Sequence, residues 1–211
     1  HLQKRIPLSA GLGGGSGNAA TTLLGLNQVF GNPLGRTELE EVAARLGSDV
    51  PFFLQRQPAL ATGRGEKVEP LQPFSSLRGV HIVLVHPGFG VSTPWAYRNL
   101  ARFPKELHGH SGRARKLAQA LEHSLGAAKA DFYNSLEAPV LEKFPLLGIF
   151  RDFLEENGST VAMMSGSGST IFGLAEGKQE AERLLERFRS RFGAFFWAQA
   201  APLDSRNSSF Q

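Results

Sequence analysis

A glycine-rich segment near the start of the chain, Ala10 to Asn18, carries the first pattern that points to chemistry. Five of its residues within a stretch of seven are glycines, and a mere connection between two elements would not justify the entropic cost of so many. Glycines let successive backbone N–H groups converge on an anion, and a helix that follows Ser16 adds the partial positive charge of its N-terminus. The segment therefore predicts a cradle for phosphate groups, and a nucleotide polyphosphate is the ligand that suits it.

Three other interpretations of this segment compete with a phosphate cradle. A flexible linker is not normally followed at once by a well-patterned apolar helix. The P-loop pattern ends in Gly-Lys-Ser/Thr, and this segment contains no lysine. The dinucleotide fingerprint G-x-G-x-x-G requires an apolar strand directly before it, whereas Pro7 interrupts the residues that precede these glycines. The sequence context argues against all three.

Four further places carry groups that could take part in chemistry. Asp49 follows a helix-ending glycine, and its carboxylate could either cap a loop or act as a general base. The segment from Ser165 to Ser169 joins two predicted strands, either as a tight hairpin or as a second binding loop. Tyr97 could belong to the core or could stack on a base. The two histidines in residues 108–110 form only a short pair without the spacing of a recognised metal motif, which favours an exposed loop over a metal site.

Patterns of apolar residues predict the elements that must position these groups. Helical spacing predicts one helix from Ser16 to Phe30 and a second that begins at Thr37, with Glu40 as its capping-box partner. Strands and helices mix without a strict βαβ repeat, so the sequence predicts an α+β fold. The aperiodic segment over 72–79 is the expected domain boundary. Further helices are predicted over 113–125, 140–157 and 179–192, and strands over 58–62, 67–71, 81–85, 160–164, 170–174 and 194–200.

Composition limits the classes of function. Of 211 residues, 41% are hydrophobic and 20% are charged, as in ordinary globular proteins. The sequence contains no cysteine, which excludes a disulfide or a thiol nucleophile and suits a reducing cytosol. A formal net charge of +4 and a pI of about 9.7 are compatible with nucleic acid, anionic lipid or a phosphate-rich small substrate. Lys and Arg form only short clusters, however, which are typical of solvated helix faces rather than of a nucleic-acid interface.

Membrane and targeting signals are not expected. No apolar run reaches the roughly 20 residues of a membrane span, and the first residues do not form a basic-then-apolar leader. The chain opens on His1 to Pro7, which looks like the middle of a domain, so we expect upstream sequence to be missing from this chain.

The motifs together resemble those of the GHMP kinases, the family of galactokinase, homoserine kinase and mevalonate kinase. The segment from Pro7 to Ala20 has the form Pro-x-x-Ala-Gly-Leu-Gly-Gly-Gly-Ser-x-Asn-Ala-Ala, which is similar to the phosphate-binding motif of that family. The resemblance continues in order through 46–53, 61–66, 86–94 and 165–170. It spans nearly the whole chain, and five motifs in the correct order are specific.

This resemblance implies a two-domain α+β architecture. Residues 1–75 would form the ATP-binding N-terminal domain, which resembles domain 2 of ribosomal protein S5 and is incomplete here. Residues 76–203 would form a ferredoxin-like C-terminal domain, and 204–211 a disordered tail. Family members also carry an upstream segment with a charge-neutralising lysine and a Tyr-His pair, to which nothing in this chain corresponds. The second glycine loop, over 165–169, would lie beside the first.

The resemblance also implies roles for individual residues in the transfer of a phosphoryl group from ATP with the help of Mg²⁺. Asp49 falls on the carboxylate that accepts the proton of the substrate hydroxyl, and Ser16 would contact Mg²⁺ or a phosphate oxygen. Where the family often has a second serine, this chain has Gly17, so no hydroxyl is available there. The remaining assignments are Ala10, Gly11, Leu12, Gly13, Gly14, Gly15, Ser16, Gly17 and Asn18 to the phosphates, and Thr93, Tyr97, Gly166, Ser167 and Gly168 to the acceptor.

Within the family, the resemblance implies phosphorylation of the 2-hydroxyl of 4-diphosphocytidyl-2-C-methyl-D-erythritol, a step of non-mevalonate isoprenoid synthesis in the bacterial cytoplasm. The expected protein is a monomer or homodimer with no nucleic-acid or membrane partner. Two alternatives stay open: a GHMP kinase for another acceptor, and a nucleotide-binding fragment without catalysis. A basic nucleic-acid binder is a third interpretation, and it predicts affinity that falls steeply with salt.

Overall fold

The fold is described from a computed structural model that covers residues 1–107 and 112–203. The chain divides into two compact units, one of residues 13–73 and one that combines residues 1–12 with the chain from Phe74 onward. The predictions for residues 108–110 and for the tail over 204–211 lie outside the described residues. Among the described residues, no helix combines the length and the hydropathy that a membrane crossing requires.

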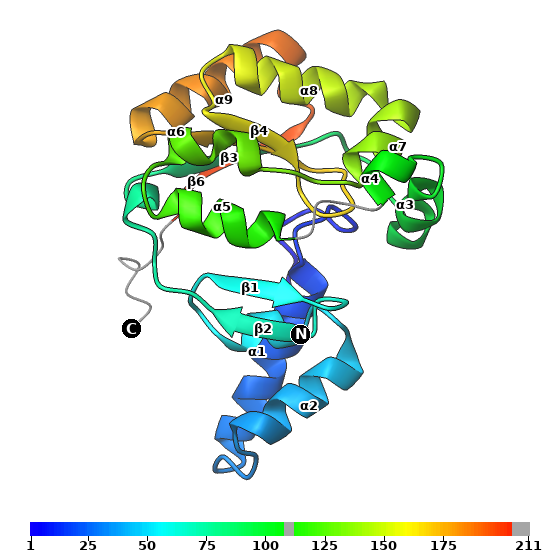
Figure 1. Ribbon diagram of the computed structural model, residues 1–211, viewed down its shortest axis with the longest axis vertical. Helices are drawn as coiled ribbons and strands as arrows, with labels where there is room; N and C mark the ends of the chain where they lie inside the picture. The colour runs from blue at the N-terminus through cyan, green and yellow to red at the C-terminus, as the bar shows by residue number, and fades with distance from the viewer. Residues whose placement is uncertain (108–111, 204–211) are drawn as a thin grey trace. The chain divides into compact units, whose positions relative to one another are not determined.

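The larger unit is built on a four-stranded antiparallel sheet with the strand order β4-β5-β3-β6 (Figure 1). Val83 of β3 lies opposite Gly173 of β5 on one side and opposite Ala200 of β6 on the other. The chain follows the order strand, helices, two strands, helix and strand, which is the ferredoxin-like arrangement and confirms that part of the predicted fold. The strands are β3 (His81–His86), β4 (Val161–Met164), β5 (Ile171–Ala175) and β6 (Trp197–Pro202).

Helices cover both faces of this sheet (Figure 1). Successive residues of a strand point to opposite faces of the sheet. On one face Val83 packs in the same core as Phe150 and Phe188. The rings of Phe150 and Phe188 meet edge to face, with centroids 4.9 Å apart. On the other face Leu174 packs with Leu121. The first face is covered by α8 (Pro145–Glu156) and α9 (Lys178–Phe192), and the second by α5 (Arg113–Leu121) and α6 (Leu125–Ala128). The unit also contains α3 (Thr93–Leu100), α4 (Pro104–Leu107) and α7 (Glu137–Lys143), with short 3-10 turns η2 (Ser75–Leu77) and η3 (Lys129–Asp131).

The smaller unit packs two helices around a short 3-10 turn. Ala20 and Ala43 are fully buried where the two helices meet, and Val50 fills the space beside them. A two-stranded antiparallel hairpin completes the unit, with Thr62 opposite Lys67, as the sequence predicted. The elements are α1 (Gly14–Val29), α2 (Arg36–Leu46), η1 (Pro51–Leu54), β1 (Ala59–Thr62) and β2 (Lys67–Pro70).

Three local predictions were wrong. The helix expected over 140–157 is two helices, because Phe144 leaves the helical region (φ −125°, ψ 73°) ahead of a proline, which disfavours helical backbone in the residue before it. The helix expected over 113–125 is likewise two, α5 and α6, with Ser124 capping the second. In α2 the N-cap is Gly35, whose N–H donates to Glu38 (2.7 Å), while Glu40 pairs instead with an arginine of the same helix.

Candidate functional site

The N-terminus of α1 is formed by the glycines themselves. Gly13 is the N-cap with left-handed backbone (φ 62°), and no side chain caps the helix. The first helical bond runs from the Gly17 N–H to the Gly13 carbonyl (2.9 Å), so the amides of residues 14–16 have no acceptor among the described residues. The first turn carries no acidic residue, and a Cβ on Gly15 would meet no atom within 4 Å. This helix end can therefore bind an anion through its backbone.

Phe53 of η1 supports this helix end. A Cβ on Gly13 would lie 2.5 Å from the Phe53 Cζ atom, and one on Gly17 would lie 3.5 Å from the same ring. The ring thus lies beside the backbone of both glycines, and at Gly13 it leaves no room for a Cβ, whereas at Gly17 a Cβ would be in ordinary van der Waals contact. Phe53 stands within a motif that the sequence reasoning quoted but to which it assigned no role.

Asp49 lies in the same unit, between the end of α2 and the start of η1. Its side chain is exposed and makes no hydrogen bond or ion pair within the described parts of the chain. The turn of the β1–β2 hairpin lies against it, because a Cβ on Gly65, whose φ is +110°, would be 3.0 Å from the Asp49 Oδ1 atom. This carboxylate is exposed and has the hairpin turn against one side of it.

In the larger unit, the second glycine loop contacts the start of the first. The Ser165 hydroxyl donates to the Gly11 carbonyl (2.9 Å), and the Thr170 N–H donates to the Ala10 carbonyl (3.1 Å). A Cβ on Gly11, where φ is +75°, would fall 1.9 Å from the Ser165 carbonyl oxygen. Close approach of two backbones therefore requires glycine here, and the second loop lies beside the Ala10–Gly11 start of the first.

The N-terminus of α3 lies beside the second loop. The Thr93 and Ser167 hydroxyl oxygens are 2.7 Å apart, and Ser92 caps the helix by accepting the Trp95 N–H (3.4 Å). Tyr97, one turn further along α3, is 61% exposed. It is therefore not a core residue, and its ring is available to a ligand.

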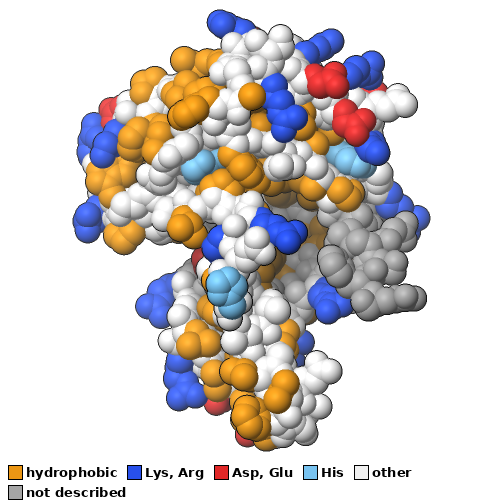
Figure 2. Space-filling model, turned by 180° about the vertical axis from the view of Figure 1, so that it is seen from behind, with side chains coloured by type: hydrophobic (Ala, Val, Ile, Leu, Met, Phe, Trp, Pro, Cys, Tyr) orange, Lys and Arg blue, Asp and Glu red, His pale blue; other side chains and the backbone are white. Residues whose placement is uncertain are grey.

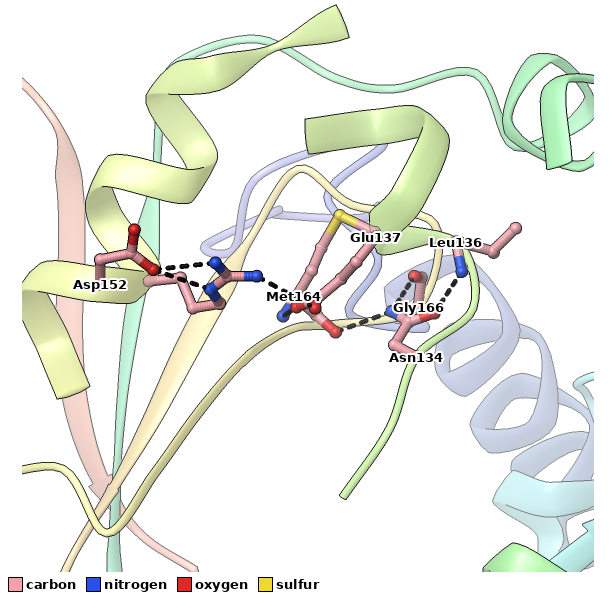
Figure 3. Close-up of polar contacts among 7 residues, drawn as sticks. Asn134, Leu136, Glu137, Asp152, Met164 and Gly166 are labelled. Carbon is pink, nitrogen blue, oxygen red and sulfur yellow. Dashed lines mark hydrogen bonds and ion pairs between the residues drawn. The ribbon is translucent and has the colours of Figure 1, made fainter. Parts of the chain in front are cut away.

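Asn134 and Glu137 contact the backbone where the second loop begins (Figure 3), and Arg151 lies beside Glu137. None of these three residues was predicted from the sequence. Asn134 Nδ2 donates to the carbonyls of Met164 (2.9 Å) and Gly166 (2.7 Å). Glu137 Oε1 accepts the Met164 N–H (2.6 Å) and Oε2 lies 3.5 Å from Arg151. Burial raises the pKa of Glu137 despite these partners. No local pattern marks the role of Asn134 and Glu137 at this loop, because the backbone atoms that they hold there lie 27 to 32 residues away in the sequence.

His86 is the last residue of β3. Its side chain is buried, and its Nδ1 accepts the Gly88 N–H (3.1 Å). Burial lowers the pKa of His86, which favours the neutral ring at neutral pH. The loop that follows His86 is fastened to the second glycine loop, because the Ser169 hydroxyl donates to the Phe89 carbonyl.

Positive charge does not gather into one field on the face that Figure 2 shows, where Lys and Arg side chains are scattered singly or in small groups. The predicted site residues divide between the two units. The unit of residues 13–73 holds Gly13, Gly14, Gly15, Ser16, Gly17, Asn18 and Asp49, and the other holds Ala10, Gly11, Leu12, Thr93, Tyr97, Gly166, Ser167 and Gly168.

Comparisons with known proteins agree with these motifs. The family profile "GHMP kinases N terminal domain" matches residues 1–57, and "GHMP kinases C terminal" matches residues 111–194. A 4-diphosphocytidyl-2-C-methyl-D-erythritol kinase of Syntrophotalea carbinolica is 41% identical over 91% of this chain and 65% of its own length. A kinase of the same name from Thermosynechococcus vestitus is 40% identical over 89% of this chain and 63% of its own length.

A solved structure has the same fold. The crystal structure of a 4-(cytidine 5'-diphospho)-2C-methyl-D-erythritol kinase superposes with a TM-score of 0.74 at 38% identity, over 94% of this chain and 68% of that one. The chain spans a little under two thirds of the length of the two curated relatives. On the motifs, the matched profiles and this structure, the chain belongs to the GHMP kinase family.

Proposed function

We propose that this protein is an ATP-dependent kinase that phosphorylates the 2-hydroxyl of 4-diphosphocytidyl-2-C-methyl-D-erythritol. The observation that carries the proposal is the glycine-lined start of α1, where three consecutive amides lack an acceptor within residues 1–107 and 112–203. The names of the relatives support this acceptor, since those relatives are 40–41% identical to most of the chain.

The backbone from Ala10 to Asn18 holds the β- and γ-phosphates of ATP in this proposal. Amides at a helix N-terminus suit a polyphosphate because they combine oriented donors with the positive end of the helix dipole. The Ser16 hydroxyl, in the first turn of α1, fits Mg²⁺ bound to those phosphates, and the ion would neutralise charge on the transferred group. The described residues contain no cluster of three metal-ligating side chains, which agrees with an ion held mainly by phosphate oxygens and water.

Asp49 serves as the general base. It accepts the proton of the 2-hydroxyl as that oxygen bonds to the γ-phosphorus and the bond from the γ-phosphorus to the bridging oxygen of ADP breaks. The exposed carboxylate, with the hairpin turn behind it, is suited to this role, because a base of this kind must above all be placed within reach of the proton.

The second loop and α3 bind the acceptor in this proposal. The paired hydroxyls of Thr93 and Ser167 supply donors and acceptors, Gly166 and Gly168 supply backbone groups, and the exposed ring of Tyr97 stacks on the cytosine. We also propose a cytoplasmic enzyme, since a sequence without cysteine suits a reducing compartment. A monomer or a homodimer is proposed as its state.

Replacing Asp49 by Asn in the full-length protein tests the proposal. ATP binding should stay within about twofold, because the amide has the same shape, while turnover falls by at least about 10²-fold as the base is lost. Glu40→Gln, which removes an exposed ion pair with Arg36 on α2, is the control and should change neither quantity appreciably. Equal turnover in the wild type and Asp49→Asn would show that Asp49 is not the base.

The choice of acceptor decides between this function and its alternatives. Release of ADP should require the cytidyl-linked alcohol and should not occur with homoserine or mevalonate. Phosphorylation of one of those alcohols instead would favour a different member of the family. ATP binding without turnover on any acceptor would favour a nucleotide-binding protein without catalysis.

A further inference from the structure

Asn134 uses its whole side-chain amide on the backbone around the second glycine loop (Figure 3). Its Nδ2 donates to the carbonyl oxygens of Met164 (2.9 Å) and Gly166 (2.7 Å), so both amide hydrogens have an acceptor. Its Oδ1 accepts the N–H of Leu136 (3.0 Å), at the start of α7. The two carbonyls flank Ser165, so one side chain fixes the residue at which the loop leaves β4.

Glu137 makes a second hydrogen bond to the same stretch of backbone. Its Oε1 accepts the Met164 N–H (2.6 Å), and its side chain is only 19% exposed. Arg151 lies 3.5 Å from Glu137 and 2.9 Å from Asp152. Since Glu137 belongs to α7 and Arg151 to α8, the backbone at Met164 is tied to two helices of the packed core.

A shift of this backbone would reach the first glycine segment. Ser165 donates to the Gly11 carbonyl (2.9 Å), and its own carbonyl occupies the space where a Gly11 Cβ would be. Further along the loop, Thr170 holds the Ala10 carbonyl (3.1 Å). The contacts from Asn134 to Ala10 and Gly11 therefore form a continuous chain of hydrogen bonds and close backbone packing within one unit.

We infer that Asn134 is a positioning residue, which fixes Met164 to Gly166 and thereby holds the second glycine loop and the Ala10–Gly11 start of the nucleotide loop in their working geometry. The hydrogen bonds that Asn134 makes to described residues are all to backbone atoms. We call the two hydrogen bonds from Asn134 Nδ2 to the Met164 and Gly166 carbonyls the clamp. The catalytic part of this inference rests on the proposed kinase function, whereas the clamp is independent of that function. Asparagine suits the position because it offers two donors to the carbonyls and one acceptor to α7.

Asn134→Asp removes the clamp with the least change of shape. The carboxylate keeps an acceptor for the Leu136 N–H but loses both donors and sets negative charge against two carbonyl oxygens. Asn134→Ala removes the donors without adding charge and serves if the Asp variant does not fold. Asn157→Asp is the matched control, because Asn157 Nδ2 also donates to a backbone carbonyl, that of Phe153 (2.9 Å), but at the far end of α8.

Hydrogen–deuterium exchange of peptides that cover 165–170 measures the clamp without any need for activity. Exchange should become about tenfold faster in both Asn134 variants, since the two hydrogen bonds from Asn134 Nδ2 are lost, and should not change in Asn157→Asp. In steady-state kinetics, kcat should fall about 10²-fold, as expected when reacting groups are misaligned, while KM for ATP changes much less because the amides of α1 are untouched.

The outcomes separate the inference from the proposed function. Unchanged exchange over 165–170 would overturn the clamp, and faster exchange with an unchanged kcat would overturn the positioning role. Equal losses of kcat in the two Asp variants would show general destabilisation and would also overturn it. A wild-type protein that phosphorylates no acceptor would count against the kinase function, while the exchange data would still decide whether Asn134 holds the loop.

Discussion

Gly15 and Gly25 lie in the same helix but in different settings. A Cβ on either would meet no atom within 4 Å, and neither has a positive φ. Alanine at either position should therefore add no clash and should favour the helix by up to about 1 kcal/mol. Of the two, only Gly15 belongs to the first turn of α1, where the amides lack acceptors in the part of the chain that the structure describes.

We predict that both Gly15→Ala and Gly25→Ala keep or raise the melting temperature, while only Gly15→Ala weakens ATP binding. A methyl group at Gly15 projects where phosphate oxygens would approach the amides, and a loss of about tenfold in affinity corresponds to about 1.4 kcal/mol. Calorimetric titration with ATP and Mg²⁺ measures this difference. Equal affinities in the two variants would show that the phosphates do not bind at this turn.

The sequence reveals some of these residues and conceals others for a physical reason. Gly11 and Gly13 adopt positive φ and touch neighbouring groups so closely that no Cβ fits, and a requirement of that kind appears directly as a glycine in the sequence. Asn134 donates hydrogen bonds to carbonyls about 30 residues away. In the sequence it cannot be distinguished from any other polar residue that precedes a helix. The glycines of the candidate site were therefore predictable, whereas Asn134 was not.

At the scale of elements, periodicity predicted strands and hairpins well and helix breaks poorly. The β1–β2 hairpin formed as expected because its turn is rich in glycine. The break at Phe144 was missed because Val140, Leu147 and Phe150 all enter the same core, so the apolar pattern runs across it. Pro145 was the available signal, since proline begins helices readily but does not continue them.

Glu137, at the start of α7, predicts how the stability of these linked elements depends on pH. Burial raises its pKa above the ordinary value of 4.5, so the folded protein binds this proton more tightly than the unfolded chain does. The contribution to stability is complete below pH 4.5 and is lost as the pH rises through the folded pKa. Glu137→Gln should remove this loss while the amide oxygen still accepts the Met164 N–H.

Denaturant unfolding of the wild type and Glu137→Gln at a series of pH values measures this effect. The free energy of unfolding of the variant, relative to the wild type, should increase as the pH rises from about 4 and become constant above the folded pKa. Glu156→Gln makes the same exchange at an exposed position of α8 and is the control. Parallel curves for the wild type and Glu137→Gln would contradict the prediction.

At the scale of the whole molecule, the order of strands in the sheet could not be predicted from the apolar patterns of single segments. In the larger unit β6 pairs with β3, so that His86 lies opposite Trp197, and nothing local to either strand specifies this partner. Family resemblance supplied the ferredoxin-like order, which the structure confirms. Periodicity alone supported only the coarser prediction of an α+β fold, because pairing depends on how the whole chain packs.

The positively charged side chains of the described residues are spread out and do not form one large patch on the face in Figure 2. In α9 the cations alternate with acids, as in the Arg183–Glu180 pair (2.6 Å) and the Lys178–Glu182 pair (3.7 Å). Arg189 donates to the Ala198 carbonyl (3.0 Å) and so serves the packing of this unit. On the face in Figure 2 the basic side chains are likewise scattered. A formal charge of +4 in this arrangement offers little to a polyanion that must contact many phosphates at once.

We therefore predict weak binding to nucleic acid with a shallow dependence on salt. A protein that neutralises 6–10 phosphates loses roughly 10³–10⁵ in affinity between 50 and 200 mM salt, and for this chain we expect a loss of less than about tenfold. Fluorescence anisotropy with labelled duplex DNA and single-stranded RNA, at both salt concentrations, measures it. Titration of a fluorescent ATP analogue is the control, and its affinity should change little if, as proposed, a few backbone amides rather than many lysines hold it. Tight binding to duplex DNA that weakens steeply with salt would contradict this prediction and would indicate that the protein binds nucleic acid.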